Sequence, residues 1–176
     1  MQPVSRVRFT RKNYYELPED WRGELIEGDL VMLPASDPSH QRLIGRLYRA
    51  LCDALPPDRV LLSPTDVDID DESVLQPDLL VLPEGTKPTK RPWTIPPPIW
   101  VAEILSPGTA HRDRGVKLKI YARRGIREAW ILDPDAETIE VHDLAARTAQ
   151  TFESKETASS GMLKPFALEV SSFFAL

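Results

Sequence analysis

The sequence is poor in several features that mark particular classes of protein. It contains one cysteine, Cys52, which excludes an intramolecular disulfide framework and a zinc cage built from cysteines. No apolar run approaches the roughly 20 residues of a transmembrane helix. Residues 1–12 also lack the apolar stretch of a signal peptide. We therefore expect a protein of the reducing cytoplasm.

Glycine is also scarce, and the 22 basic residues are outnumbered by 27 acidic ones. Only 8 residues are glycine, and no glycine-rich phosphate loop or dinucleotide fingerprint occurs, so we expect no dependence on ATP or NAD. The net charge of −5 argues against a protein that coats DNA non-specifically. Proline, by contrast, supplies 17 of the 176 residues, about twice its average usage, which indicates rigid loop corners.

The length and the hydrophobic content predict one globular domain. A chain of 176 residues with 41% hydrophobic residues can fill a substantial core. No internal repeat, low-complexity segment or interdomain linker is visible. We expect a short N-terminal arm over residues 1–20, followed by a single domain over residues 21–176.

Hydrophobic patterning predicts strands interspersed with two main helices. The sequence around Gly28 is typical of a β-hairpin, and Asp37 or Ser39 is placed to cap a helix whose apolar residues recur up to Leu55. A second helix is predicted over residues 113–124, and residues 83–98 are predicted as a stiff, proline-rich surface loop. Further strands are predicted at 60–62, 67–69, 78–82, 99–105, 127–132, 138–142 and 148–152. The expected fold class is therefore α/β (or α+β), with a mixed β-sheet flanked by helices.

Charge is distributed unevenly along the chain. Residues 111–127 contain a single acid but seven basic residues: Arg112, Arg114, Lys117, Lys119, Arg123, Arg124 and Arg127. Such a segment is most often a solvated helix face, and the alternative is a site that meets a polyanion at one place. Five acids fall within residues 66–72, which is more typical of a solvated hairpin tip than of an ion site.

Two carboxylates lie in segments that are otherwise apolar. Asp78 begins one predicted strand and Glu103 lies within another. A carboxylate in such a strand is costly to bury unless it is paired or binds a cation. If the two strands are neighbours, both carboxylates could share a hard cation such as Mg²⁺ at one end of the sheet. The structural alternatives are a turn or cap carboxylate for Asp78 and a buried ion pair for Glu103.

A lysine on the following helix completes the pattern. Lys117 lies four residues after Asp113 and four before Tyr121, so it shares a helix face with each of them. Two carboxylates that hold a metal ion, together with a lysine that stabilises the attacking water or the transition state, are suited to phosphodiester hydrolysis. The alternative for Asp113 and Lys117 is a surface ion pair of small energetic value.

The order of these motifs resembles the Uma-two family, which belongs to the restriction-endonuclease-like PD-(D/E)XK nucleases. The matching motifs are Pro77-Asp78, Glu103-Ile104-Leu105-Ser106-Pro107, Asp113-Arg114-Gly115-Val116-Lys117, Tyr121, Trp130-Ile131-Leu132-Asp133-Pro134, Glu24-Leu25-Ile26-Glu27-Gly28 and His40. The resemblance covers residues 15–174.

The resemblance implies a restriction-endonuclease-like fold and a DNA endonuclease that depends on Mg²⁺ or Mn²⁺. It implies that Asp78, Glu103 and the backbone carbonyl of Ile104 bind the metal. The superfamily pattern has its lysine two residues after the glutamate, where this sequence has Leu105. The family has its lysine on the following helix instead, at the place of Lys117.

Two further residues and four arginines are assigned by the same resemblance and by the charge pattern. Glu24 and His40 would complete the catalytic pocket, although His40 could equally be a helix N-terminal residue hydrogen-bonded to a carboxylate. The arginines that would hold DNA phosphates are Arg112, Arg114, Arg123 and Arg124.

Cleavage of both DNA strands favours a homodimer, with residues 139–141 or Phe173-Phe174 at its interface. Two other functions stay open. Leu105 and the acidic net charge are compatible with a catalytically inactive nucleic-acid or partner-binding module on the same fold. A glycosidase with paired carboxylates is disfavoured by the aromatic content of 7%.

Overall fold

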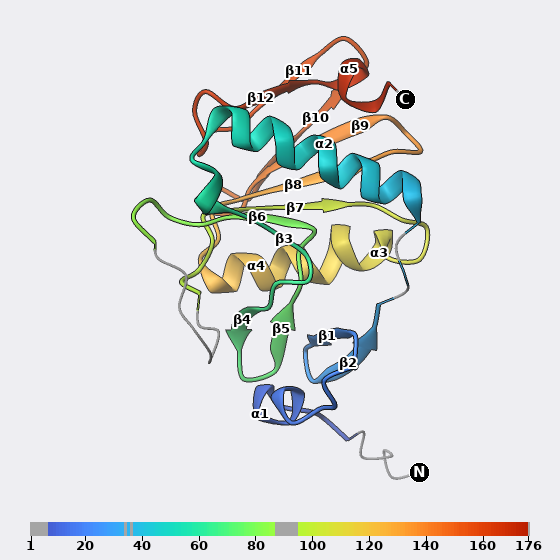
Figure 1. The fold of residues 1–176 in the computed structure, drawn as a ribbon, viewed down its shortest axis with the longest axis vertical. Helices are drawn as coiled ribbons and strands as arrows, with labels where there is room; N and C mark the ends of the chain where they lie inside the picture. The colour runs from blue at the N-terminus through green and yellow to red at the C-terminus, as the bar shows by residue number, and fades with distance from the viewer. Residues whose placement is uncertain (1–6, 34, 36, 87–94, 176) are drawn as a thin grey trace.

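A six-stranded mixed β-sheet forms the centre of the protein in this computed structural model, which describes residues 7–33, 35, 37–86 and 95–175 (Figure 1). The strands follow the order β10-β9-β8-β7-β6-β3. They are β3 (Val60–Leu62), β6 (Leu79–Val81), β7 (Trp100–Ile104), β8 (Glu128–Asp133), β9 (Thr138–Asp143) and β10 (Thr148–Glu153). Only β7 and β8 pair in parallel, and the other neighbours are antiparallel.

Helices cover both faces of this sheet. Helix α2 (Pro38–Ala54) lies on one face, with Asp37 as its N-cap. On the other face, the crossover from β7 to β8 is helical and consists of α3 (Ala110–Arg112), the π-helical segment η2 (Asp113–Lys117) and α4 (Leu118–Arg124). A long crossover of this kind is what a parallel pair of strands requires.

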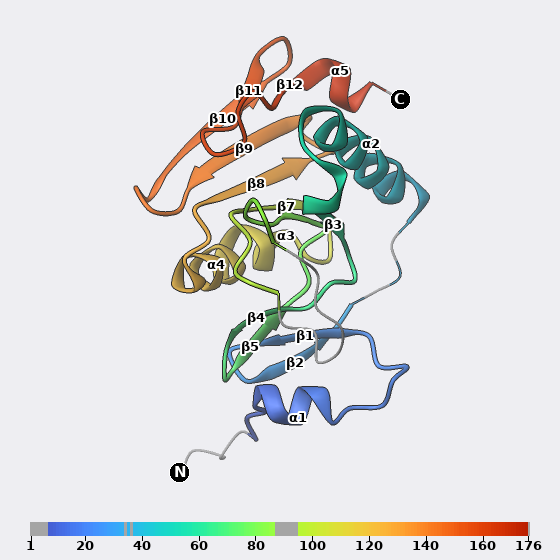
Figure 2. The same cartoon turned by 60° about the vertical axis from the view of Figure 1, so that its left-hand side comes forward.

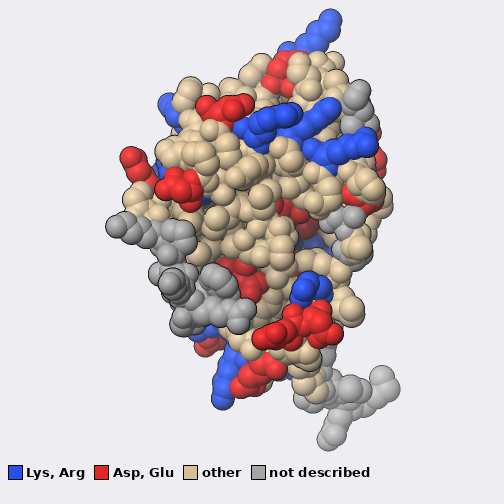
Figure 3. Space-filling model, in the orientation of Figure 1, with Lys and Arg blue, Asp and Glu red and all other residues tan. Residues whose placement is uncertain are grey.

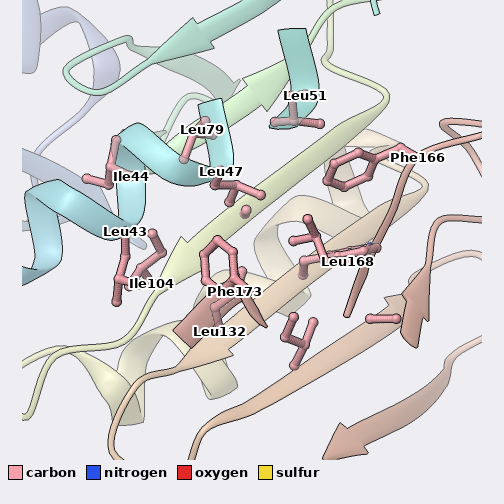
Figure 4. Close-up of a cluster of buried hydrophobic side chains, with 14 of the residues drawn as sticks. Leu43, Ile44, Leu47, Leu51, Leu79, Ile104, Leu132, Phe166, Leu168 and Phe173 are labelled. Atoms are coloured by element: carbon pink, nitrogen blue, oxygen red, sulfur yellow. The ribbon is translucent and has the colours of Figure 1, made fainter. Parts of the chain in front are cut away.

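The main core lies between α2 and the sheet. Apolar residues of α2 recur every three or four positions and therefore share one face of the helix. Figure 4 shows this face against the strands: Leu43, Ile44, Leu47 and Leu51 lie over Leu79, Ile104 and Leu132, with Phe166, Leu168 and Phe173 closing the cluster. A second cluster, which includes Ile120 and Tyr121, fills the opposite face of the sheet.

A smaller, four-stranded sheet stands at the end of the molecule opposite α5 (Val170–Phe174) (Figure 2). Its order is β2-β1-β5-β4, from β1 (Gly23–Ile26), β2 (Asp29–Met32), β4 (Val67–Asp70) and β5 (Ser73–Leu75). Glu27 and Gly28 both have positive φ in the turn from β1 to β2, as a tight two-residue hairpin turn requires. Helix α1 (Arg11–Tyr15) packs on this sheet through Tyr14.

The predicted fold class, hairpin, first helix and strands are confirmed, with three differences. The second helix begins at Ala110 rather than at residue 113 and contains a π-helical segment. Strand β5, which follows the acidic run, was not predicted. Neither was the two-stranded ladder of β11 (Thr157–Ser159) and β12 (Ala167–Glu169). Residues 87–94 of the predicted proline-rich loop lie outside the described residues.

Three of the residues expected at a dimer interface are buried, whereas Val141 of the expected range 139–141 is partly exposed. Ile139, Phe173 and Phe174 are buried in the main core, because β9 and α5 pack their apolar side chains beneath α2 and against the sheet. The homodimer itself and the division of the chain at residue 20 stay predictions. No helix among the described residues is long and apolar enough to span a membrane.

Candidate active site

The two predicted metal-binding acids lie beside one another: Glu103 is on β7, and Asp78 directly precedes the neighbouring strand β6. Strands β6 and β7 are antiparallel, and Leu79 pairs with Ala102, so Asp78 and Glu103 stand next to one another in register. The backbone N–H of Ile104 donates a hydrogen bond to Asp78 Oδ2 at 2.8 Å. The expectation that these two strands are neighbours is therefore confirmed, and both acids lie where β7 ends and the chain turns toward the crossover.

Lys117 is the centre of a buried cluster of charges. Its Nζ lies 2.7 Å from Glu103 Oε1, 3.0 Å from Glu24 Oε1 and 3.4 Å from Asp113 Oδ1. All four side chains are buried. The hydroxyl of Tyr121 donates a second hydrogen bond to Glu103 Oε1. Five residues from the two sheets and the crossover helix therefore meet at one place.

The crossover helix brings three side chains to this place. Asp113 and Lys117 lie at the two ends of the π-helical segment, and both side chains point into the buried face. Tyr121 follows one turn later on α4 and faces the same cluster. π-Helical turns are rare and occur frequently at functional sites. The sequence predicted the shared face of these residues but not the π-helical turn.

Glu24 comes from the other sheet. Strand β1 directs its side chain toward Lys117, and Glu24 Oε1 also accepts a hydrogen bond from the backbone N–H of Gln76 at 2.7 Å. These contacts join the small sheet to the crossover helix, although residues 24 and 117 are far apart in the sequence.

The cluster holds more negative than positive charge. Glu24, Glu103 and Asp113 surround a single lysine. Burial raises the pKa of Glu103 well above its usual value; Lys117 opposes that rise, and the nearby carboxylates add to it. Burial lowers the pKa of Lys117, but the carboxylates outweigh it, so the pKa rises well above its usual value and the ammonium stays charged. A site of this kind attracts a further cation or a proton.

His40 closes the site from the first turn of α2. Its Nε2 lies 2.9 Å from the carbonyl oxygen of Ile104 and 3.3 Å from Asp78 Oδ2. A carbonyl oxygen can only accept, so Nε2 carries a proton. The hydrogen bond with Asp78 raises the pKa of His40 in spite of its burial. His40 is thus a helix N-terminal residue bonded to a carboxylate, the second of its two predicted roles, and its place in a catalytic pocket stays a prediction.

The oxygen atoms at this sheet end suit a hard divalent cation. Among the described residues, no group of three or more His, Cys, Asp or Glu side chains is arranged to hold a metal. The predicted set has only two carboxylates and one carbonyl, all of them oxygen donors of the kind that Mg²⁺ prefers. Glu103 Oε2 and Asp78 Oδ1 accept no hydrogen bond from the part of the chain that is described. With the excess of negative charge, this donor set fits Mg²⁺ or Mn²⁺.

The four arginines predicted to bind phosphates do not form one free basic surface. Arg114 makes ion pairs with Asp133 and Glu140, each at 2.7 Å. Arg123 makes ion pairs with Glu27 at 2.9 Å and Asp70 at 3.3 Å. Arg112 and Arg124 have no carboxylate partner among the described residues.

Two residues that touch the cluster were not among the predicted site residues. Asp113 and Tyr121 both lie four positions from Lys117, and that spacing was the available signal. The contact from Gln76 had no sequence signal, because it depends on where β5 ends beside β1.

Comparisons with known proteins identify a matching family and a solved structure with the same fold. A family model described as "Uma2: Putative restriction endonuclease" matches residues 11–171, a range that includes every residue of the cluster. A crystal structure of "a putative nuclease belonging to DUF820" from Anabaena variabilis has a TM-score of 0.81 to this structure at 20% sequence identity. The likeness covers 94% of this chain and 97% of that chain, and it shows a shared fold. No curated protein matches the chain.

Proposed function

The chain belongs to the Uma2 (Uma-two) family of putative restriction endonucleases, and we propose that it is a DNA endonuclease that depends on Mg²⁺ or Mn²⁺. One observation carries the proposal. A charged lysine, Lys117, is buried against Glu103, and Glu103 stands beside Asp78 at the end of two paired strands. An ion pair of this kind is costly to bury, and a role in chemistry accounts for its retention.

Asp78, Glu103 and the carbonyl of Ile104 would hold the cation. When bound, the cation neutralises charge on the scissile phosphate and lowers the pKa of a water molecule. The Lys117 ammonium has three N–H donors, and the one that faces Asp113 at 3.4 Å, the longest of its three contacts, would turn to that water or to the phosphate oxygens, whose negative charge grows in the transition state. Glu24, Asp113 and Tyr121 are positioning residues, because they fix the ammonium and the carboxylate of Glu103.

The lysine on the crossover helix accounts for the presence of Leu105 at the position where the superfamily pattern has its lysine. In the superfamily pattern the lysine shares the strand of the glutamate, and Leu105 in that place is a buried apolar residue. Here the ammonium reaches Glu103 from the crossover helix instead, at 2.7 Å. The same two groups, a glutamate carboxyl and a lysine ammonium, are therefore brought together by a different element, which supports the proposal that the chain has kept its nuclease activity.

Incubation of supercoiled plasmid DNA with the purified protein tests the proposal. We expect nicking or cleavage with Mg²⁺ or Mn²⁺, and none with EDTA. Asp78→Asn and Lys117→Met should lose cleavage. Lys119→Met is the matched control, because Lys119 lies on the same helix but is exposed. Cleavage by Lys117→Met at the wild-type rate would contradict the assignment. DNA binding without cleavage under either cation would favour the inactive binding module.

A further inference from the structure

Helix α2 carries a row of arginines on the side that faces away from the core. Arg42, Arg46 and Arg49 are spaced four and three residues apart, so they share one face of the helix. The buried residues of α2, such as Leu43 and Leu47, lie on the opposite face. Figure 3 shows Lys and Arg side chains gathered over the region of α2 in the upper part of the view.

The charges of this row are not neutralised by carboxylates. None of the three arginines makes an ion pair within the described part of the chain, in contrast to Arg114 and Arg123. Arg46 donates from Nη1 to the backbone carbonyls of Phe173, at 2.8 Å, and Ala175, which hold its position but leave its charge in place. Asp53, one turn beyond Arg49, is the acid that continues this face, and it forms no ion pair with Arg49.

The row begins beside the candidate active site. The first turn of α2 contains His40, whose Nε2 contacts Asp78 and Ile104. From Arg42 to Arg49 the helix rises about 10 Å. Phosphates along one strand of DNA follow at about 3.4 Å of helix axis, so the row is about as long as three phosphate-to-phosphate steps.

We infer that the outer face of α2, through Arg42, Arg46 and Arg49, binds the phosphate backbone of DNA as it leads away from the active site. The inference rests on the proposed endonuclease function for the identity of the polyanion. It replaces two of the four predicted phosphate contacts, those of Arg114 and Arg123 on the crossover helix, by contacts from α2. The physical reason is that an arginine already paired with two carboxylates offers a phosphate no net positive charge, whereas an unpaired arginine does.

Binding measured in EDTA separates this inference from catalysis. Fluorescence anisotropy of a short labelled DNA duplex over a series of salt concentrations gives the affinity and its salt slope. We compare Arg42→Gln/Arg49→Gln with Arg114→Gln/Arg123→Gln. Arg46 is left in place because it anchors the C-terminal segment. Lys155→Gln/Lys164→Gln removes the same charge from exposed positions outside α2 and serves as the matched control.

We expect the α2 variant to lose ~10-fold or more in affinity and about 2 units of the salt slope, one for each phosphate contact. The control should keep the wild-type slope, and Arg42→Lys/Arg49→Lys should restore most of the affinity. The inference is overturned if the control loses as much as the α2 variant, if only the Arg114 and Arg123 variant loses affinity, or if the wild-type protein does not bind DNA. Binding that depends on α2 without cleavage under Mg²⁺ or Mn²⁺ would remove the endonuclease proposal and leave this surface in place.

Discussion

Glu103 and Glu128 are two equally buried glutamates on adjacent strands, and their surroundings are opposite in kind. Each side chain belongs to a residue that is 4% exposed, one on β7 and the other on β8. Glu128 accepts four hydrogen bonds from neutral donors: Trp130 Nε1, Ser160 Oγ and the backbone N–H groups of Gly161 and Met162. Glu103 has Lys117 and Tyr121 on a single oxygen and three further carboxylates nearby.

The difference shows how to separate a structural carboxylate from a functional one. Both oxygens of Glu128 are satisfied by groups that close the turn after β11, so this residue holds two parts of the fold together. Glu103 is held in a place where burial and neighbouring acids raise its pKa, which costs folding free energy. A buried carboxyl group beside other acids lowers the stability of the fold, and residues that do so concentrate at functional sites.

The largest expected effect is on cleavage. Glu103→Gln removes one proposed metal ligand and should lower the rate of DNA cleavage by about 10³-fold or more, because the charge that holds the cation is lost. Glu128→Gln should cleave at a rate close to the wild type under conditions in which circular dichroism shows it to be folded. A steady-state plasmid nicking assay measures both. An equal loss of cleavage rate in the two variants would contradict the assignment of Glu103 as functional and Glu128 as structural.

The next effect is on the free energy of unfolding, and here we expect the larger loss in Glu128→Gln rather than in Glu103→Gln. In Glu128→Gln the amide NH₂ cannot accept hydrogen bonds, so two of the four donors are left unsatisfied at a cost of about 2 kcal/mol. Glu103→Gln keeps an oxygen for Lys117 and Tyr121 and relieves the crowding of acids, so its stability should be unchanged or higher. Urea unfolding followed by tryptophan fluorescence gives both free energies. A larger loss in Glu103→Gln than in Glu128→Gln would contradict this assignment.

The last effect, and the smallest for a change of one pH unit, is on the pH dependence of stability. The pKa of Glu103 is raised in the folded protein, so above its ordinary value near 4.5 the folded state keeps a proton that the unfolded chain has released. The free energy of unfolding therefore falls as pH rises, by at most about 1.4 kcal/mol per pH unit, until the pH passes the folded pKa. Glu103→Gln should lack this decrease. We measure the free energy of unfolding of the wild type and of Glu103→Gln over a pH series without divalent cations, and the difference between them gives the contribution of Glu103. Parallel pH profiles would show that Glu103 does not titrate in this way.

Local patterns predicted much of this fold. The turn at Gly28, the cap at Asp37 and the apolar runs of β6 and β7 depend on residues close together in the sequence, and each is present. Strand β5 was missed because its three residues follow an acidic run and carry no alternation of their own. The π-helical turn was missed because the same residues fit an ordinary helix.

Part of the site was predictable and part was not. The order of Asp78, Glu103 and Lys117 was visible as a motif, and the structure brings the three elements together. The arginine partners were not visible, because Asp133 and Glu140 reach Arg114 from another hairpin of the sheet. A count of basic residues therefore overstated the free charge of the crossover helix and overlooked α2.

The sequence by itself determined most of the elements, their order and the residues that form the family motif, because hydrophobic period, caps and turn residues act over a few neighbouring positions. The tertiary structure alone decided which charges are paired. It joined Glu24 of one sheet to Lys117 on the crossover helix, satisfied Glu128 with the turn after β11, and left Arg42 and Arg49 without a carboxylate partner among the described residues. The energy of a buried charge depends on what lies within a few ångströms of it, and those neighbours come from segments that only the fold brings together.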